Sequence, residues 1–207
     1  MSFGYHVLGF GSYPNRSSSG GNSGSGIAQG LTPSLLTLTG QSNPSAAVNN
    51  NTIDLSNAGG VDYTSETARL VFLYEKGGSY TGDLQIYDIE FSSTSYDINS
   101  GTYNFYSTRA NDQFYTSASW WPVQTGTSGG RWNRDAAGTG SSGTGLTLSG
   151  ENYFYAETSS PAANVTGYKF WLRSDPVTLS SSSPNLTFRD GRYGSGIGTL
   201  NVHLDIQ

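Results

Sequence analysis

The sequence contains no cysteine and little charge. Its 207 residues include 10 Lys and Arg, 15 Asp and Glu and 2 His, which gives a formal net charge of −5. Without cysteine the chain can form neither disulfide bonds nor thiolate metal sites. The negative charge balance disfavours nucleic acid as a partner, because binding to phosphates needs a basic surface. No apolar run approaches the roughly 20 residues of a membrane-spanning helix, so we expect no membrane insertion.

Strong helix formers are also scarce, and residues typical of strands and turns take their place. The chain has 28 Gly and 14 Tyr, and Ser, Thr and Asn are frequent throughout. This composition favours many short strands joined by polar loops. Only 34% of the residues are apolar, so the core must depend on aromatic side chains, which bury the largest area each. We predict an all-β fold with roughly ten strands in two packed antiparallel sheets.

The clearest strand pattern occupies residues 67–91. The side chains of residues 68–75 form two alternating rows that are both largely apolar, which predicts a strand covered on both faces, and a second strand follows a Gly-rich run at residues 76–82. We interpret this segment as a hairpin. Residues 184–207 align with residues 68–91 without a gap, and identical residues fall at core and turn positions, including Leu70 on Leu186 and Gly82 on Gly198. Either all hairpins with glycine turns look alike, or two equivalent units occupy related places in one two-sheet fold.

The first 30 residues have a different composition from the rest. Glycine alternates there with apolar side chains, followed by a run of Ser, Gly and Asn. We predict a docking arm at residues 1–16, a flexible Gly/Ser-rich tether at residues 17–30 and a β-sandwich head at residues 31–207. The arm would add a strand to the sheet edge of a partner; the alternative is that it packs on its own head. Its docking residues would be Phe3, Tyr5, Val7, Leu8 and Phe10.

Residues 132–207 contain four motifs in sequence: WNRDAAGTGSSGTG, ENYFYAETSS, LRSDPVTL and NLTFRDGRYGSGIGTLNVHL. In this order, and with Asp175 as an insertion in the third, they resemble the motifs of a MAM domain, an adhesive jelly-roll module. The family's closing motif is similar to GDLQIYDIEF at residues 82–91, which implies a circular permutation. The resemblance implies a two-sheet antiparallel jelly-roll sandwich with an extended N-terminal arm. The four cysteines typical of the family are absent here.

The N-terminal sequence MSFGYHVLGFGS resembles the N-termini of virion structural proteins from marine tailed phages. That resemblance implies a virion protein that is made in the bacterial cytoplasm, forms a homo-oligomer and contacts other virion proteins through its arm. The resulting hypothesis is a non-enzymatic decoration protein of a capsid or tail, with the sandwich displayed for host or glycan adhesion. The alternatives are a lectin-like bacterial adhesion module outside any virion, and an inactive or unusual glycan hydrolase.

Three tryptophans are candidates for a glycan or interface contact. Trp120, Trp121 and Trp132 lie in residues 117–145, which are rich in Gly, Ser and Thr and are predicted to form a long loop. Exposed indole rings can stack on sugar rings, or they can close one end of the sandwich or an interface.

Carboxylates provide the remaining candidates. Asp83, Asp88, Glu90 and Glu157 offer the oxygen ligands that Ca²⁺ prefers, although the same residues also suit solvated strand ends. We expect no other cofactor. Retaining glycoside hydrolysis needs two carboxyl groups about 5–5.5 Å apart. Asp88 and Glu90 would share a strand face, but Ile86 occupies the position of the nucleophile, so we predict no enzymatic activity.

Overall fold

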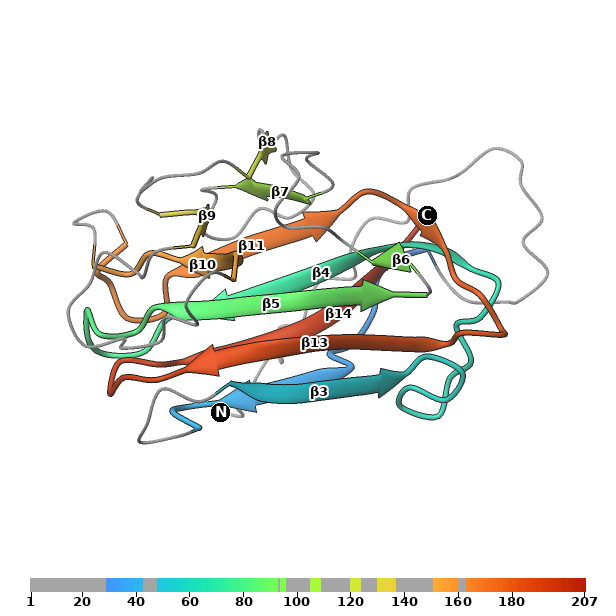
Figure 1. Cartoon of the computed structure of the whole chain (residues 1–207), viewed down its shortest axis with the longest axis horizontal. Helices are drawn as coiled ribbons and strands as arrows, with labels where there is room; N and C mark the ends of the chain where they lie inside the picture. Colours follow the sequence, from blue (N-terminus) through green and yellow to red (C-terminus); the bar gives the residue numbers. More distant parts are fainter. Residues whose placement is uncertain are drawn as a thin grey trace, which may run out of the picture.

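The computed structural model describes residues 29–42, 48–92, 94–95, 105–108, 120–123, 130–136, 151–159 and 163–207. These residues form two antiparallel β-sheets packed against each other (Figure 1). The prediction of an all-β two-sheet sandwich is therefore confirmed. In the ranges given above the structure has no helix, and so none that is long and apolar enough to cross a membrane.

The first sheet, called sheet A, has the order β1-β14-β4-β11-β7-β8, with β2 also paired to β14 and β12 to β4. Its central strands are β14 and β4, which pair along their whole length from Thr199–Glu75 to Ile206–Ala68. The bounds are β1 Gly30–Leu31, β2 Leu36–Thr39, β4 Thr67–Glu75, β7 Phe105–Thr108, β8 Trp121–Pro122, β11 Lys169–Ser174, β12 Val177–Thr178 and β14 Thr199–Ile206.

The second sheet, called sheet B, has the order β3-β13-β5-β10-β9, with β6 paired to β5. Strands β13 and β5 are neighbours near its centre, as β14 and β4 are in sheet A. The bounds are β3 Asn49–Asp54, β5 Leu84–Phe91, β6 Thr94–Ser95, β9 Trp132–Asp135, β10 Tyr153–Ala156 and β13 Asn185–Arg192.

Eight of these strands form a jelly roll. Strands β2, β4, β11 and β14 lie in sheet A, and β3, β5, β10 and β13 lie in sheet B. The neighbour orders 2-14-4-11 and 3-13-5-10 make two interlocked Greek keys, which is the jelly-roll arrangement. All eight strands come from residues 36–206, so the N-terminal segment contributes none of them.

The two predicted hairpins are wrong in one respect: each is a β-arch that crosses between the sheets. Strand β4 lies in sheet A and β5 in sheet B, and β13 lies in sheet B and β14 in sheet A. Each strand pairs with a strand of the other arch, β4 with β14 and β5 with β13. The glycine-rich run at residues 191–198 is likewise part of a connection between the sheets, and its first two residues belong to β13. Both segments lie in one sandwich and at related places in it, which agrees with the alternative of two equivalent units in one two-sheet fold.

Aromatic side chains fill the space between the sheets, as the composition predicted. Phe72 of sheet A meets Phe188 of sheet B edge-on, with 5.2 Å between ring centroids. Phe105 and Phe154 also meet across the core, with ring centroids 5.0 Å apart and the ring planes tilted by 51°. Burial of each such side chain contributes about 1.5–3 kcal/mol. The aromatic rings therefore compensate for the small number of apolar residues in the chain.

The loops of the two arches, residues 76–83 and 193–198, lie against each other at one end of the sandwich, on the left in Figure 1. We call this pair of loops the double arch. A Cβ atom on Gly198 would lie 2.0 Å from the carbonyl oxygen of Glu75, and one on Gly82 would lie 2.5 Å from that of Gly196. Only glycine permits such close backbone contact. The glycines matched in the sequence alignment, Gly82 and Gly198, therefore share a packing role.

Candidate functional site

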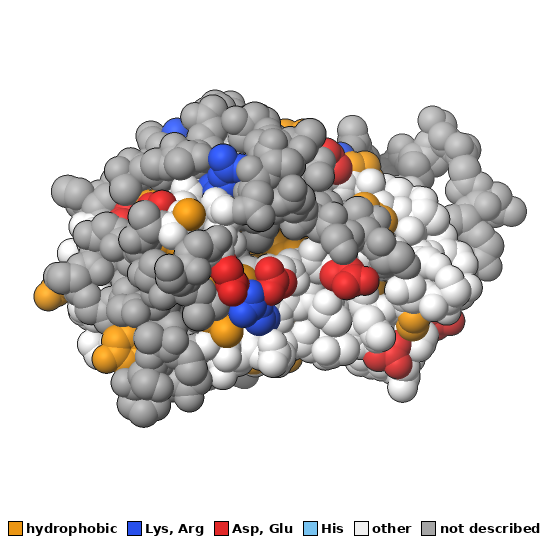
Figure 2. All heavy atoms as spheres, viewed as in Figure 1, with side chains coloured by type: hydrophobic (Ala, Val, Ile, Leu, Met, Phe, Trp, Pro, Cys, Tyr) orange, Lys and Arg blue, Asp and Glu red, His pale blue; other side chains and the backbone are white. Residues whose placement is uncertain are grey.

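The outer face of sheet B carries an exposed cluster of charged side chains. Arg189 of β13 forms ion pairs through Nη2 with Asp88 of β5 and with Glu151, which precedes β10. Its guanidinium group lies over the Tyr87 ring, 5.6 Å from the centroid. We call these four residues the Arg189 cluster. Figure 2 shows basic and acidic side chains meeting near the centre of this face.

A β-bulge in β5 turns Asp88 toward the cluster. Leu84 and Ile86 face the core, and so does Ile89, which breaks the alternation by one residue. The pairing with β13 shifts its register at the same place, and Asp88 has a φ of +45°. Asp is one of the few residues that adopt this left-handed conformation readily. The bulge therefore places a carboxylate on the surface where regular alternation would have directed it inward.

Tyrosines form a buried layer beneath and beside the cluster. Tyr87, Tyr153 and Tyr155 are fully buried, but they form a cluster separate from the core between the sheets. In β10 the core-facing residues are Phe154 and Ala156. Tyr87 and Tyr153 lie 5.2 Å apart, and the Tyr87 hydroxyl donates to Gln85 Oε1 at 2.9 Å. Burial raises the pKa of Tyr87 and Tyr155 far above the usual value for a phenol. These phenols are therefore neutral at physiological pH.

The Arg189 cluster contains two acidic side chains and one basic side chain. Burial lowers the pKa of Arg189, but its hydrogen bonds and its attraction to Glu151 and Asp88 outweigh that effect and raise it. Two carboxylates thus face one guanidinium, with side chains 63% exposed for Asp88 and 44% for Glu151. The exposed part of the cluster is therefore polar and offers hydrogen-bonding groups to a ligand, whereas the Tyr87 ring beneath it is buried.

The three predicted tryptophans have different environments. Trp120 lies on the outer face of sheet A, where the Arg173 guanidinium stacks 4.0 Å from its ring centroid. Trp121 lies in β8 and Trp132 in β9, so the predicted long loop is interrupted by two strands. Trp132 is 1% exposed and belongs to the core. The predicted glycan contact therefore does not hold for Trp132, because its ring has no surface to offer.

The four predicted calcium ligands do not converge. Asp83 is buried and accepts hydrogen bonds from the N–H and hydroxyl of Thr158 at 2.8 and 2.9 Å. Glu157 accepts from Ser159, Asp88 belongs to the Arg189 cluster, and Glu90 lies further along β5. Asp83 and Glu90 are seven positions apart on an extended chain, on the order of 20 Å. Across the described ranges no three acidic or histidine side chains form a group that could hold a metal ion.

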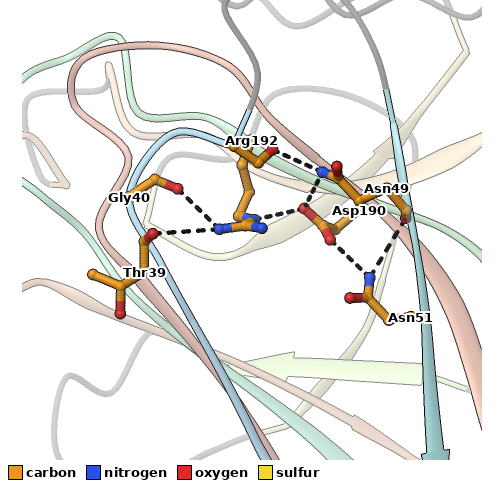
Figure 3. Close-up of polar contacts among 7 residues, drawn as sticks. Thr39, Gly40, Asn49, Asn51, Asp190 and Arg192 are labelled. Atoms are coloured by element: carbon orange, nitrogen blue, oxygen red, sulfur yellow. Dashed lines mark hydrogen bonds and ion pairs between the residues drawn. The ribbon is translucent and has the colours of Figure 1, made fainter.

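A buried polar network inside the sandwich was not predicted. Arg192 Nε donates to Asp190 Oδ2 at 2.6 Å, and the amide of Asn51 donates to Asp190 Oδ1 at 2.7 Å. Arg192 Nη1 also donates to the carbonyl oxygens of Gly40 and Thr39 at 3.0 and 3.4 Å. Figure 3 shows these groups facing one another. The network, here called the Asp190–Arg192 clamp, ties sheet B to the segment that follows β2.

A sequence signal for the clamp did exist. Leu186 and Phe188 face the core, and Asp190 and Arg192 continue the same alternation at the end of β13. A charged pair on the inward row of a strand predicts a buried ion pair. Both charges are satisfied by several partners, which is the usual requirement for burying them.

The predicted docking residues Phe3, Tyr5, Val7, Leu8 and Phe10 lie outside the described residues. Their docking role stays a prediction. No family model and no solved structure matches the chain. The resemblances to MAM domains and to phage virion proteins therefore also stay predictions, and the functional argument rests on the geometry described above.

Proposed function

We propose that this protein is a non-enzymatic structural protein of a tailed-phage virion. Its N-terminal arm would dock on the capsid or tail, and its jelly roll would be displayed on the surface for adhesion to the host or to glycans. Other virion proteins would be its partners, and the displayed form would be a homo-oligomer.

The observation that carries this proposal is the completeness of the jelly roll without the arm. Every strand of the two Greek keys comes from residues 36–206. Strand β1, which begins at Gly30, is an edge strand paired only to the end of β14, at Ile206 and Asp205. A head of this kind does not need the apolar residues of the arm to complete its sheets. We propose that a partner contacts those residues and removes their apolar surface from water.

The geometry of the Arg189 cluster supports a binding role over a catalytic one. Asp88 and Glu151 both form ion pairs with one guanidinium nitrogen of Arg189. Both carboxylates are thus engaged by the same cation, and together they offer a ligand a fixed set of charged, hydrogen-bonding groups. We therefore expect the cluster to bind a ligand without cleaving it.

The exposed carboxylates of the cluster favour one alternative, a lectin-like bacterial adhesion module outside any virion. Both functions use the head in the same way and differ in the role of the arm. In the alternative, residues 1–28 would have no virion partner, and the chain would be absent from purified particles.

Particle incorporation tests the proposal. Phage encoding the full chain, the chain lacking residues 1–28, or a full-length variant with Phe3, Tyr5, Leu8 and Phe10 replaced by Ser would be purified and quantified by mass spectrometry. We expect the full chain to be present and both variants to be lost from the particles. A variant with the tether residues 17–28 in scrambled order is the control and should be retained.

Two results would decide against the proposal. Full incorporation of the truncated chain would show that the arm is not the anchor. Absence of the full-length chain from the particles would favour the bacterial adhesion module. Circular dichroism of each variant would establish that the head stays folded, so that loss from the particle reports on docking.

A further inference from the structure

The double arch presents an unusual combination of exposed aromatic and hydroxyl groups. Among the described residues only three large hydrophobic side chains are well exposed, Val61, Tyr80 and Val165, and Tyr80 is 50% exposed at the tip of the first loop. Tyr193, on the second loop, is half-buried. Ser79, Thr81 and Ser195 line the same tip with hydroxyl groups.

Hydrogen bonds hold the tip rigid. The hydroxyls of Thr81 and Ser195 lie 3.2 Å apart and join the two loops. The Tyr74 hydroxyl donates to the carbonyl of Gly82 at 2.6 Å and accepts from the N–H of Gly198 at 3.2 Å. The Thr158 hydroxyl shares its hydrogen between Asp83 Oδ1 and the carbonyl oxygen of Tyr80, at 2.9 and 3.0 Å. The backbone beneath Tyr80 is thus fixed on two sides, while its ring remains in solvent.

The tip is also uncharged. The two loops contain only two charged residues, Lys76 and Asp83, which are 2% and 0% exposed. Burial lowers the pKa of Lys76, and the nearby charge of Asp83 partly opposes that shift. Both charges are directed away from the surface. A ligand at this tip would meet an aromatic ring and neutral groups that both donate and accept hydrogen bonds.

We propose that the double arch is a binding site for neutral saccharides. A sugar ring offers an apolar face for Tyr80 and hydroxyls for Ser79, Thr81 and Ser195. Small ligands bury little area, and a fixed site lowers the cost of ordering loops on binding. Tyr, Ser and Gly are also the residues that adaptable binding loops use most. The inference rests on the adhesive role proposed for the head and gives that role a location separate from the Arg189 cluster.

Amide chemical shifts of the full-length, ¹⁵N-labelled protein test this inference. Four neutral probes would be titrated separately to about 10 mM, a range that detects millimolar affinity: maltohexaose, cellohexaose, laminarihexaose and chitohexaose. We expect saturable shifts for the amides of residues 79–81 and 195 with at least one probe. Tyr80→Ala should weaken that binding at least about tenfold, or about 1.4 kcal/mol.

Val61→Ala is the matched control. Val61 is also exposed, but it belongs to the segment that joins β3 to β4. That connection lies at the opposite end of the sandwich from the double arch (Figure 1). The Val61→Ala variant should bind the probe as tightly as the unchanged protein does. The inference is overturned if no probe gives saturable shifts at the double arch, if the shifts map to the Arg189 cluster, or if Tyr80→Ala binds as tightly as the control. None of these results depends on particle incorporation, so the failure of this inference and failure of the arm to dock are separate outcomes.

Discussion

Two arginines of strand β13, three positions apart, make ion pairs in opposite surroundings. Arg192 lies on the inner row, with a side chain 10% exposed, and its partner Asp190 is fully buried. Arg189 lies on the outer row, with a side chain 23% exposed, and its partners Asp88 and Glu151 are far more exposed. The residue types are nearly the same. The strand's alternation alone decides which arginine stabilises the fold and which is available to a ligand.

The comparison shows why similar ion pairs differ in their contribution to stability. Water screens an exposed pair, and such a pair contributes about 0–1 kcal/mol. A buried charge that loses its partner has no solvent to replace it. The clamp also satisfies both groups with further hydrogen bonds, from Asn51 to Asp190 and from Arg192 to the carbonyls after β2. The loss of one partner should therefore affect the whole end of the sandwich.

Arg192→Met should have the largest effect. The change keeps much of the side-chain volume and leaves Asp190 buried without its cation. We expect the free energy of unfolding to fall by about 3–5 kcal/mol, measured by urea denaturation. A loss below about 1 kcal/mol would mean that the clamp behaves like an exposed pair and would remove the distinction between the two arginines.

Gly198→Ala extends the comparison to the glycines of the double arch. The added methyl group would overlap the Glu75 carbonyl, which backbone strands hold in place. We expect a loss of about 1–3 kcal/mol or more, again from urea denaturation. Gly78→Ala is the control, because nothing lies within 4 Å of the added atom. Equal effects at the two positions would contradict the close contact between the loops.

His203→Gln tests a third polar side chain, on the outer face of sheet A. The ring Nδ1 lies 3.0 Å from the Thr32 carbonyl, and burial lowers the pKa of His203, with hydrogen bonds to Thr32 and Pro33 partly opposing that shift. Below about pH 6.5 the unfolded chain binds a proton that the folded chain resists. The histidine should therefore cost stability as pH falls below about 6.5 and cost nothing above it. Between pH 8 and pH 5 the melting temperature of the Gln variant should fall less than that of the unchanged protein. Parallel curves for the two proteins would contradict the lowered pKa of His203.

Arg189→Ala should have the smallest effect on stability. The carboxylates that Arg189 pairs with are exposed, and its guanidinium carbon lies 5.6 Å from the centroid of the Tyr87 ring. We therefore expect the free energy of unfolding to fall by about 0–1 kcal/mol. Urea denaturation of this variant and of Arg192→Met under the same conditions gives the comparison directly. A loss as large as that of Arg192→Met would show that the outer cluster is structural and would weaken the case for a ligand there.

The strands could be predicted from the sequence because alternation is a local property. Residues 67–75 and 84–91 carry apolar side chains at the spacing of strands covered on both faces, and both are largely buried strands in the structure. The crossing between sheets was missed because a glycine-rich loop gives the same pattern in a hairpin and in an arch. Which sheet a strand joins depends on its partners, and β4 and β14 are more than a hundred residues apart in the sequence.

The candidate site was predictable only in part. The sequence shows the break in alternation at Asp88, since Ile86 and Ile89 are both apolar, but it does not show that Arg189 lies opposite. That pairing depends on the register between β5 and β13. Glu151 joins the cluster from a third part of the chain. Trp132, by contrast, looked like a loop residue because its neighbours are polar, whereas strand β9 directs it into the core.

Amide hydrogen exchange of the full chain and of residues 29–207 tests the central claim most directly. All eight strands of the jelly roll come from residues 36–206, so the fold should not depend on the N-terminal segment. We predict that the truncated chain folds and that the amides of β4, β5, β13 and β14 keep the protection they have in the full chain. Loss of protection in these central strands, or failure of the truncated chain to fold, would show that the arm belongs to the head and would contradict the account.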